Sequence, residues 1–241
     1  MKYQNCIFDL YGTLVDLHTD ELHPRLWQEM TALYRERGAD YSAEELCEDY
    51  FRIAREIEQE PPYVYEEHPE IKIENVFRRL FLNKGVDASL DLSIGVGEHF
   101  RKSSMEYIRL FDGAMELLKT LRANGQGVWL LSNAQRVFTA PELRSLGIES
   151  LFDGVYLSSD YGCKKPDSRF FNVLLTERSI PVQTAIMIGN DAVCDIQGAQ
   201  SVGLSTLYIR TDVPPEEPLP KADYALKQMD MKRVKEILTQ E

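Results

Sequence analysis

The segment FDLYGTLVD near the start of the chain contains a carboxylate where an α/β enzyme would carry a nucleophile. A short apolar run ends at Phe8, Asp9 follows it, and a Tyr11-Gly12-Thr13 turn comes next. The run is typical of a buried strand, so we expect Asp9 at the carboxyl end of that strand. Ligands of open parallel sheets bind at this end. The pattern therefore predicts nucleophilic chemistry at Asp9.

Polar side chains also follow apolar runs at other places in the chain. These clusters are Ser132-Asn133, Lys164-Lys165-Pro166, and Asn190-Asp191 with Asp195. Taken singly, each is typical of a simple structural feature, such as a helix cap, solvated lysines before a proline, or an acidic loop. Because parallel strands present their carboxyl ends at one edge of a sheet, we expect all of these clusters to face Asp9.

The elements that must position these residues alternate between buried strands and helices. The expected strands are 127–131, 155–157, 185–188 and 205–209. The expected helices include one from 114 to about 124, 141–147 (with Pro141 in its first turn), 167–179 and 231–238. Strands that are apolar throughout are typical of a parallel sheet covered on both faces. The predicted fold class is α/β, with a Rossmann-like doubly wound parallel sheet. The proline-rich stretch from Val213 to Pro220 is expected to be a surface connection.

A helical insert separates the first strand from the rest of this core. From Asp20 to about Ser104 the apolar residues recur at helical spacing, and no strand is expected there. Gly95-Val96-Gly97 follows no strand, so it does not indicate a dinucleotide-binding loop. We therefore predict a catalytic core formed by residues 1–16 and 105–241, and an all-helical inserted domain of residues 17–104.

The composition argues against several classes of partner. Lys and Arg number 27 against 39 Asp and Glu, which gives a net charge of −12. This charge disfavours binding to nucleic acid or anionic membranes, because both are bound through basic surfaces. The 4 cysteines form no CxxC pair, no apolar stretch could span a bilayer, and the first residues lack a secretory apolar region. We expect a cytoplasmic monomer or homodimer with a small-molecule substrate.

In their order and spacing, the polar clusters resemble those of the haloacid dehalogenase superfamily. The segments that carry the resemblance are DLYGTLVD, LLSNAQ, GCKKPDSRF and MIGNDAVCDIQGAQSVGL. The superfamily is marked by a nucleophilic Asp in DxxGT, a Ser or Thr that ends the second strand, a Lys often followed by Pro, and a carboxylate loop. The resemblance covers nearly the whole chain. The helical insert is similar to the superfamily's C1-type cap domain.

The resemblance implies a role for each residue of the first clusters. Asp9 would attack an electrophilic centre and form a covalent aspartyl intermediate. Ser132 and Lys165 would bind the oxygens of the transferred group, with Asn133 as part of the same catalytic cluster. Thr13 would hold the phosphate or the surroundings of the nucleophile. Lys165 is favoured over the lysine before it because it directly precedes a proline, as the superfamily's lysine often does.

The resemblance also implies a Mg²⁺ site. Its expected ligands are Asp9, the backbone carbonyl of Tyr11, and Asp191, since Mg²⁺ prefers oxygen ligands. Asp195 would support the loop or the lysine. Asn190 stands where many phosphatases of the superfamily have Asp, and it would contribute a carbonyl oxygen or shape the turn.

Tyr11 stands where superfamily phosphatases usually have a second Asp, which protonates the leaving group. A positioned acid typically contributes roughly 10²–10⁴ in rate, and a phenol with a pKa of about 10 is poorly matched to neutral pH. The superfamily's 2-haloacid dehalogenases carry Tyr here, because a halide leaves without a proton. Their last loop, however, has a Ser-Asn cluster and uses no metal, whereas this chain has Asp191 and Asp195.

These observations leave three hypotheses open. The first is a Mg²⁺-dependent phosphatase of a small phosphorylated metabolite, with a preference for aryl or acyl phosphates. The second is a metal-independent 2-haloacid dehalogenase. The third is a non-catalytic binding protein with the superfamily fold. The carboxylate-rich last loop favours the first hypothesis, because such a loop is hard to explain without a cation.

Overall fold

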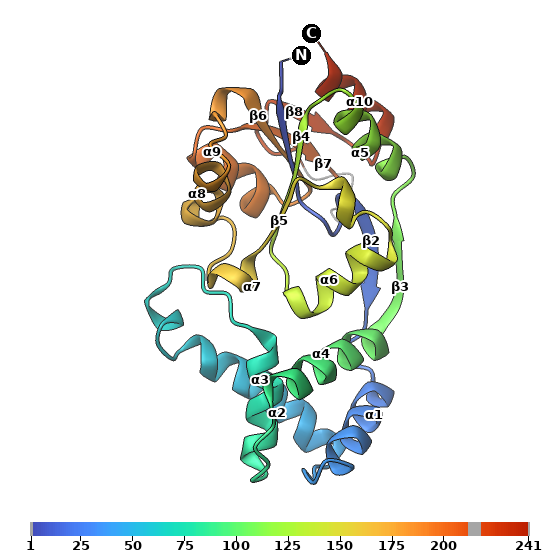
Figure 1. The fold of residues 1–241 in the computed structure, drawn as a ribbon, viewed down its shortest axis with the longest axis vertical. Helices are drawn as coiled ribbons and strands as arrows, with labels where there is room; N and C mark the ends of the chain where they lie inside the picture. Colours follow the sequence, from blue (N-terminus) through green and yellow to red (C-terminus); the bar gives the residue numbers. More distant parts are fainter. Residues whose placement is uncertain (1, 212–217, 241) are drawn as a thin grey trace.

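The computed structural model describes residues 2–211 and 218–240. Figure 1 shows an elongated molecule, with a sheet and its covering helices at one end and a group of helices at the other. Both termini lie at the end of the sheet farthest from those helices. The connection expected from Val213 to Pro220 falls largely outside the described residues. Within those residues, no helix is long and apolar enough to cross a membrane.

A six-stranded sheet confirms the predicted α/β class. Its order is β5-β4-β1-β6-β7-β8, and every neighbouring pair is parallel. The strands are β1 (Asn5–Phe8), β4 (Gly127–Ser132), β5 (Gly154–Leu157), β6 (Ala185–Gly189), β7 (Ser205–Ile209) and β8 (Tyr224–Leu226). Phe8 lies opposite Leu130 on one side and Ile188 on the other. The residues that follow β1, β4 and β6 are therefore brought to one edge of the sheet.

Helices cover both faces of the sheet, as Figure 1 shows. One face packs on α5 (Ala114–Ala123) and α10 (Met231–Thr239), and the other on α8 (Ser168–Glu177). The alternation of β1 explains this arrangement, because Cys6 and Phe8 join the first apolar cluster whereas Ile7 joins the second. The remaining helical elements are α6 (Arg136–Ser145), α7 (Ser158–Tyr161), α9 (Gly198–Ser201), the 3₁₀ turns η1 (Tyr63–Tyr65), η2 (Glu149–Leu151) and η3 (Val182–Thr184), and the π-helix η4 (Ala192–Gln197).

Helices α1 (Pro24–Arg35), α2 (Ala43–Glu58), α3 (Ile73–Asn83) and α4 (Leu90–Ser104) form the inserted domain, which we call the cap. They share an apolar core of their own that also takes in Val137 and Phe138 of α6. Helix α2 begins with a capping box, in which Ser42 and Glu45 satisfy each other's backbone amides. The described residues between 20 and 104 contain no named strand, as expected.

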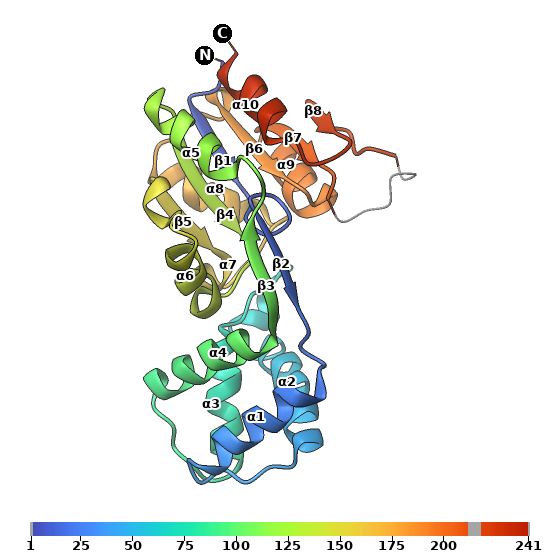
Figure 2. The same ribbon diagram turned by 90° about the vertical axis from the view of Figure 1, so that its right-hand side faces the viewer.

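A two-stranded antiparallel ribbon joins the cap to the core (Figure 2). It consists of β2 (Val15–Thr19) and β3 (Met105–Leu110), with Val15 opposite Leu110. Neither strand was predicted from the sequence. The two strands are separated by the whole insert, so no local pattern indicates that they pair. The proposed borders of the cap, after residue 16 and after residue 104, both fall at this ribbon.

The start of α6 differs from the sequence prediction. The helix begins at Arg136 rather than at Pro141, which lies inside it. The first two residues of α7 replace the missing cap: Ser158 Oγ accepts from Ala134 N at 2.8 Å, and Ser159 Oγ accepts from Arg136 N at 2.9 Å. These contacts are tertiary, so the local sequence carries no signal of them.

Candidate active site

Asp9 extends strand β1 by one residue, because its backbone amide donates to Ile188 O at 2.9 Å. The chain then turns sharply: Leu10 O accepts from the amides of Thr13, Leu14 and Val15. Gly12 has a φ of 77° within this turn, a conformation that side chains other than glycine rarely adopt. We call residues 10–15 the catalytic loop. Its tight closure fixes Asp9, which is only 8% exposed, at the edge of the sheet.

Lys165 lies at the centre of the charged groups. Its Nζ donates to Asp9 Oδ1 at 2.7 Å, to Asp195 Oδ1 at 2.6 Å and to Leu131 O at 2.9 Å. Ser132 Oγ donates to the same Asp9 oxygen at 3.0 Å. Since an ammonium group has three protons, Lys165 is fully occupied by these acceptors. The structure thus brings together the predicted nucleophile, serine and lysine.

The buried position of these charges affects their pKa values. Burial alone would lower the pKa of Lys165, but the carboxylates of Asp195 and Asp9 outweigh burial and raise it. Burial raises the pKa of Asp195 to about 6, even though Lys165 acts in the opposite direction. Lys165 is therefore charged at neutral pH and neutralises part of the surrounding negative charge.

Asn133 holds the backbone of Lys165 from both sides. Its Oδ1 accepts from Lys165 N at 2.8 Å, and its Nδ2 donates to Lys165 O at 2.9 Å. Both polar atoms of the amide are engaged in this way. The geometry is that of a residue that positions Lys165. The sequence had indicated only that Asn133 belongs to the catalytic cluster.

The last predicted cluster forms the turn after β6. Asp191 Oδ1 accepts from the amides of Val193 and Cys194 and so caps the π-helix η4. Asp195 Oδ2 accepts from Asp191 N at 2.9 Å. Thr13 Oγ1 donates to Asn190 Oδ1 at 3.2 Å, which joins the catalytic loop to this turn.

Gly189, the last residue of β6, makes room for Asp195. A Cβ added to this glycine would lie 2.2 Å from Asp195 Oδ2, which is closer than atoms can approach. Glycine at this position therefore allows Asp195 to lie against β6 and accept from Lys165. Packing against Asp195, rather than contact with a ligand, therefore explains the glycine at position 189.

A cavity of about 200 Å³ opens in front of these groups. Its lining residues are Asp9, Tyr11, Ser132, Asn133, Lys165, Asn190, Asp191, Cys194 and Asp195. Burial, followed by the charges of Asp191 and Asp195, raises the pKa of the Cys194 thiol to about 11, so it is neutral at pH 7. Three carboxylates then face one ammonium group, and the lining carries a formal charge of −2.

The cavity residues fit a Mg²⁺ ion by their donor chemistry. The described residues contain no group of three or more His, Cys, Asp or Glu side chains arranged to hold a metal. Mg²⁺ does not require such a group, because it keeps several waters and binds one or two carboxylates together with the substrate's phosphate. Asp9 and Asp191 line the same cavity as Tyr11, and the excess charge of −2 matches a divalent cation. Their role as ligands remains a prediction.

The Tyr11 hydroxyl contacts α6. It donates to Glu142 Oε2 and lies 2.9 Å from Thr139 Oγ1. Arg101 of the cap stands 5.6 Å above the Tyr11 ring and donates to Glu142 Oε1. Burial, and then the charge of Glu142, raise the pKa of Tyr11, so the phenol stays protonated. Arg101 and Glu142 gave no sequence signal, since neither lies near a motif.

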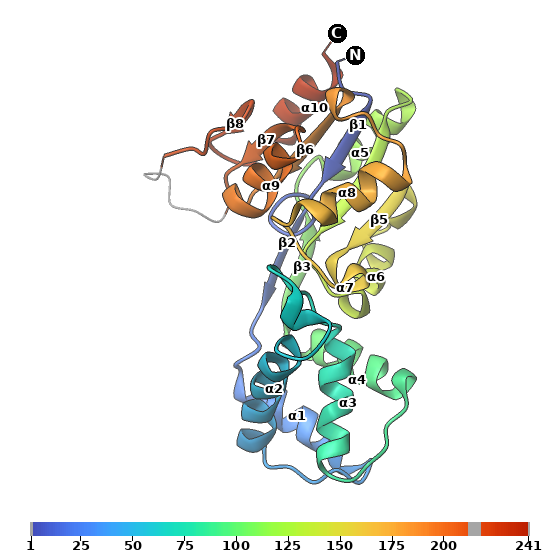
Figure 3. The ribbon, with the colours of Figure 1, turned by 90° about the vertical axis from the view of Figure 1, so that its left-hand side faces the viewer.

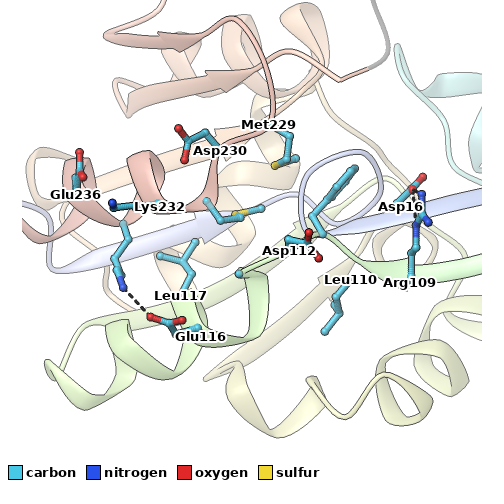
Figure 4. A pocket seen from close by; sticks show the side chains of 14 residues that line it. Asp16, Arg109, Leu110, Asp112, Glu116, Leu117, Met229, Asp230, Lys232 and Glu236 are labelled. Atoms are coloured by element: carbon cyan, nitrogen blue, oxygen red, sulfur yellow. Dashed lines mark hydrogen bonds and ion pairs between the residues drawn. The ribbon is translucent and has the colours of Figure 1, made fainter.

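A larger cavity, of about 1120 Å³, lies beside α5 and α10 (Figure 4). It contains none of the predicted site residues. Two of its basic side chains are already paired with carboxylates: Arg109 with Asp16 at 2.6 Å, and Lys235 with Glu116 at 2.8 Å. Size alone therefore does not identify the candidate active site, because the predicted site residues line the smaller cavity.

Comparisons with known proteins identify relatives over most of the chain. The family model of haloacid dehalogenase-like hydrolases matches residues 3–203. A mouse haloacid dehalogenase-like hydrolase domain-containing protein 3 is 31% identical over 133 residues, which cover 51% of this chain and about half (53%) of that protein. A ribulose-1,5-bisphosphate 5-phosphatase of Halopiger xanaduensis is 28% identical over 174 residues, 72% of this chain and 71% of that protein.

Among solved structures, a 2-haloacid dehalogenase from Pseudomonas syringae pv. Tomato has a similar fold, with a TM-score of 0.68. It is 20% identical in sequence, and the match covers 98% of both chains. At this identity the likeness concerns the fold alone.

Proposed function

Because the chain belongs to the haloacid dehalogenase-like hydrolases, we propose that it is a Mg²⁺-dependent phosphatase of a small phosphorylated metabolite, acting through an aspartyl-phosphate intermediate at Asp9. The observation that carries the proposal is the formal charge of −2 on the lining of the cavity. A phosphate ester brings further negative charge, so it would be repelled unless a divalent cation is bound. The similarity to a ribulose-1,5-bisphosphate phosphatase supports the same class of substrate.

Asp9 would attack phosphorus through Oδ2, because Ser132 and Lys165 both hold Oδ1. This fixed orientation removes rotational freedom before the reaction. Lys165 would contact the phosphoryl group only by releasing one of its present acceptors. Mg²⁺, held by Asp9, the Tyr11 carbonyl and Asp191, would neutralise phosphate charge in the transition state.

The leaving group would depart without a proton from the protein. The Tyr11 hydroxyl, which stands where a catalytic acid would be expected, donates to Glu142 instead. The bond from phosphorus to the leaving oxygen therefore breaks most easily when that oxygen is a stable anion. We expect aryl and acyl phosphates to be better substrates than alkyl phosphates. Water then hydrolyses the aspartyl phosphate, releasing phosphate and restoring Asp9.

Hydrolysis of p-nitrophenyl phosphate tests the proposal. We expect turnover with Mg²⁺, loss of turnover on chelation with EDTA, and a decrease of roughly 10³-fold or more in kcat for Asp9→Asn. Asp112→Asn, in the separate cavity of Figure 4, is the matched control and should retain the wild-type rate. Turnover that survives both chelation and Asp9→Asn would refute the mechanism.

Dehalogenation is the second candidate function, and Tyr11 is the residue that favours it. A halide needs no acid, and Lys165 already compensates one carboxylate without a metal. Release of chloride from 2-chloropropionate in the absence of added metal would support this candidate, and the absence of release would remove it. Mg²⁺ binding without turnover of a broad panel of phosphates would instead indicate a non-catalytic binding protein.

A further inference from the structure

The cap and the core meet where α4 packs on α6, the helix whose Thr139 and Glu142 contact Tyr11 of the catalytic loop. Phe138 of α6 stacks on Phe100 of α4 with 6.3 Å between ring centroids, and it belongs to the cap's apolar core. Gly97 of α4 permits the close approach, since a Cβ there would lie 3.2 Å from Val137. Contacts of this kind hold the cap against the helix that also contacts Tyr11.

A charged pair is buried within this seam. Arg101 Nε donates to Glu142 Oε1 at 2.7 Å, and the two side chains are only 11% and 6% exposed. The Arg101 guanidinium also lies 5.3 Å from the centre of the Phe138 ring. Burial of two charges is costly unless their hydrogen-bonding groups are satisfied. The second oxygen of Glu142 meets this requirement by accepting from the Tyr11 hydroxyl.

Tyr11 is the residue of the catalytic loop that contacts both Arg101 and Glu142. The loop is closed from inside by bonds to Leu10 O, and Thr13 joins it to Asn190. On the side of the cap, the Tyr11 hydroxyl contacts Glu142 and Thr139 of α6, and its ring lies under Arg101 of α4. One side chain thus links three segments that are far apart in the sequence.

We propose that Arg101, Glu142 and Tyr11 form a latch through which the cap, when packed on α6, positions the catalytic loop after Asp9. Tyr11 is then a positioning residue whose side chain transmits the contact of the cap to the loop. The inference rests on the proposed function, because it assigns a role in the reaction of Asp9. It also gives a reason for tyrosine at this position that does not depend on the leaving group.

Hydrogen exchange of the backbone amides of residues 10–15 measures the latch without any substrate. Tyr11→Phe keeps the ring and removes the hydroxyl, so we expect exchange of this segment to rise about tenfold, as for a lost hydrogen bond to a charged group. Arg101→Lys keeps the charge but removes the planar guanidinium that contacts Glu142 Oε1. It should therefore also raise exchange of residues 10–15, although Arg101 contacts the other oxygen of Glu142 than Tyr11 does. Arg25→Lys, in an exposed ion pair of the cap with Glu29, is the control and should change nothing there.

The double variant Tyr11→Phe/Arg101→Lys tests whether the contacts act as one unit. In a latch, the second change adds little to the effect of the first on exchange of residues 10–15. Fully additive effects, or unchanged exchange in both single variants, would overturn the proposal. Both substitutions are conservative. Thermal melting identifies any variant that fails to fold, and exchange in the other single variant then decides whether the latch exists.

Steady-state kinetics with p-nitrophenyl phosphate distinguish positioning from mere stabilisation. We expect kcat of Tyr11→Phe to fall about tenfold with KM within about twofold, because Ser132 and Lys165, which would bind the substrate's phosphate, lie on other segments of the chain. A residue that only stabilised the fold would leave kcat per folded molecule unchanged. An unchanged kcat of Tyr11→Phe, with faster exchange of residues 10–15, would therefore contradict the positioning role. If the wild type hydrolyses no phosphate ester, the proposed function fails alone, while the exchange experiment still decides about the latch.

Discussion

At the scale of single residues, the centre of the site is a buried cation between two carboxylates. Lys165 is 2% exposed and Asp195 is 1% exposed, and each is the other's ion-pair partner. Removal of one partner from such a pair is far more costly than the pair itself is stabilising, because a buried charge is left uncompensated. Lys165 therefore contributes both to the chemistry of Asp9 and to the stability of the fold.

We predict that Lys165→Met abolishes turnover and lowers the free energy of unfolding at pH 7 by about 3–5 kcal/mol. Urea denaturation measures the second effect. The preceding residue provides the matched control, since Lys164 makes no ion pair with Asp9 or Asp195, and Lys164→Met should cost no more than about 1 kcal/mol. Equal losses for the two variants would show that Lys165 does not compensate the buried carboxylates.

At the scale of elements, helix α4 forms the side of the cap that packs on the core. Its two glycines have different surroundings: a Cβ on Gly95 would meet nothing within 4 Å, whereas a Cβ on Gly97 would lie 3.1 Å from the Phe77 ring. Glycine inside a helix is destabilising unless packing requires it. A Cβ on Gly97 would also lie 3.2 Å from Val137, so this glycine favours close packing of α4 on both α3 and α6, whereas Gly95 serves no such contact.

We predict that Gly95→Ala raises the free energy of unfolding by about 0.5–1 kcal/mol, the usual gain for alanine over glycine in a helix. For Gly97→Ala the same gain should be cancelled or reversed, because Phe77 and Val137 must move. Urea denaturation of the two variants side by side gives the comparison. An equal gain at both positions would show that Gly97 does not lie as close to Phe77 and Val137 as the structure indicates.

At the scale of the whole molecule, the cap contacts the core at a second junction besides the latch. The segment before α3 pairs with the segment before Lys165: Lys164 N donates to His68 O at 3.0 Å, and Glu70 N donates to Gly162 O at 3.1 Å. Figure 3 shows this part of the cap beside α7. The Glu70 carboxylate accepts from Ser158 and Gln135 of the core. The cap thus contacts the segment before Lys165 and, through Arg101, the Tyr11 ring in the loop after Asp9.

We predict that the stability of this junction depends on pH through Glu70. Burial raises the pKa of Glu70 above its ordinary value of 4.5, so its stabilising contribution is complete below that value and is lost as pH rises through the raised pKa. Glu70→Gln, which has no such charge, should therefore gain stability relative to the wild type between about pH 4 and pH 7. Thermal denaturation at the two pH values measures the difference.

The neighbouring Glu67 provides the control for this pH effect. Its side chain is 88% exposed, so the difference between Glu67→Gln and the wild type should stay constant over the same range. A difference for Glu70→Gln that does not change with pH would contradict the effect of burial on this carboxyl.

The sequence by itself determined the local features: apolar runs that became β1, β4, β5, β6 and β7, and the polar residues that follow them. Asp9, Ser132, Lys165 and Asp195 were predictable as one group because parallel strands present their carboxyl ends together. The tertiary structure decided what depends on distant partners. Strand order, the β2–β3 ribbon and the start of α6 are set by contacts between segments far apart in the chain, which local patterns do not encode. The contacts of the Tyr11 side chain are decided in the same way, because Glu142 of α6 and Arg101 of the cap lie far from Tyr11 in the sequence and neither belongs to a motif.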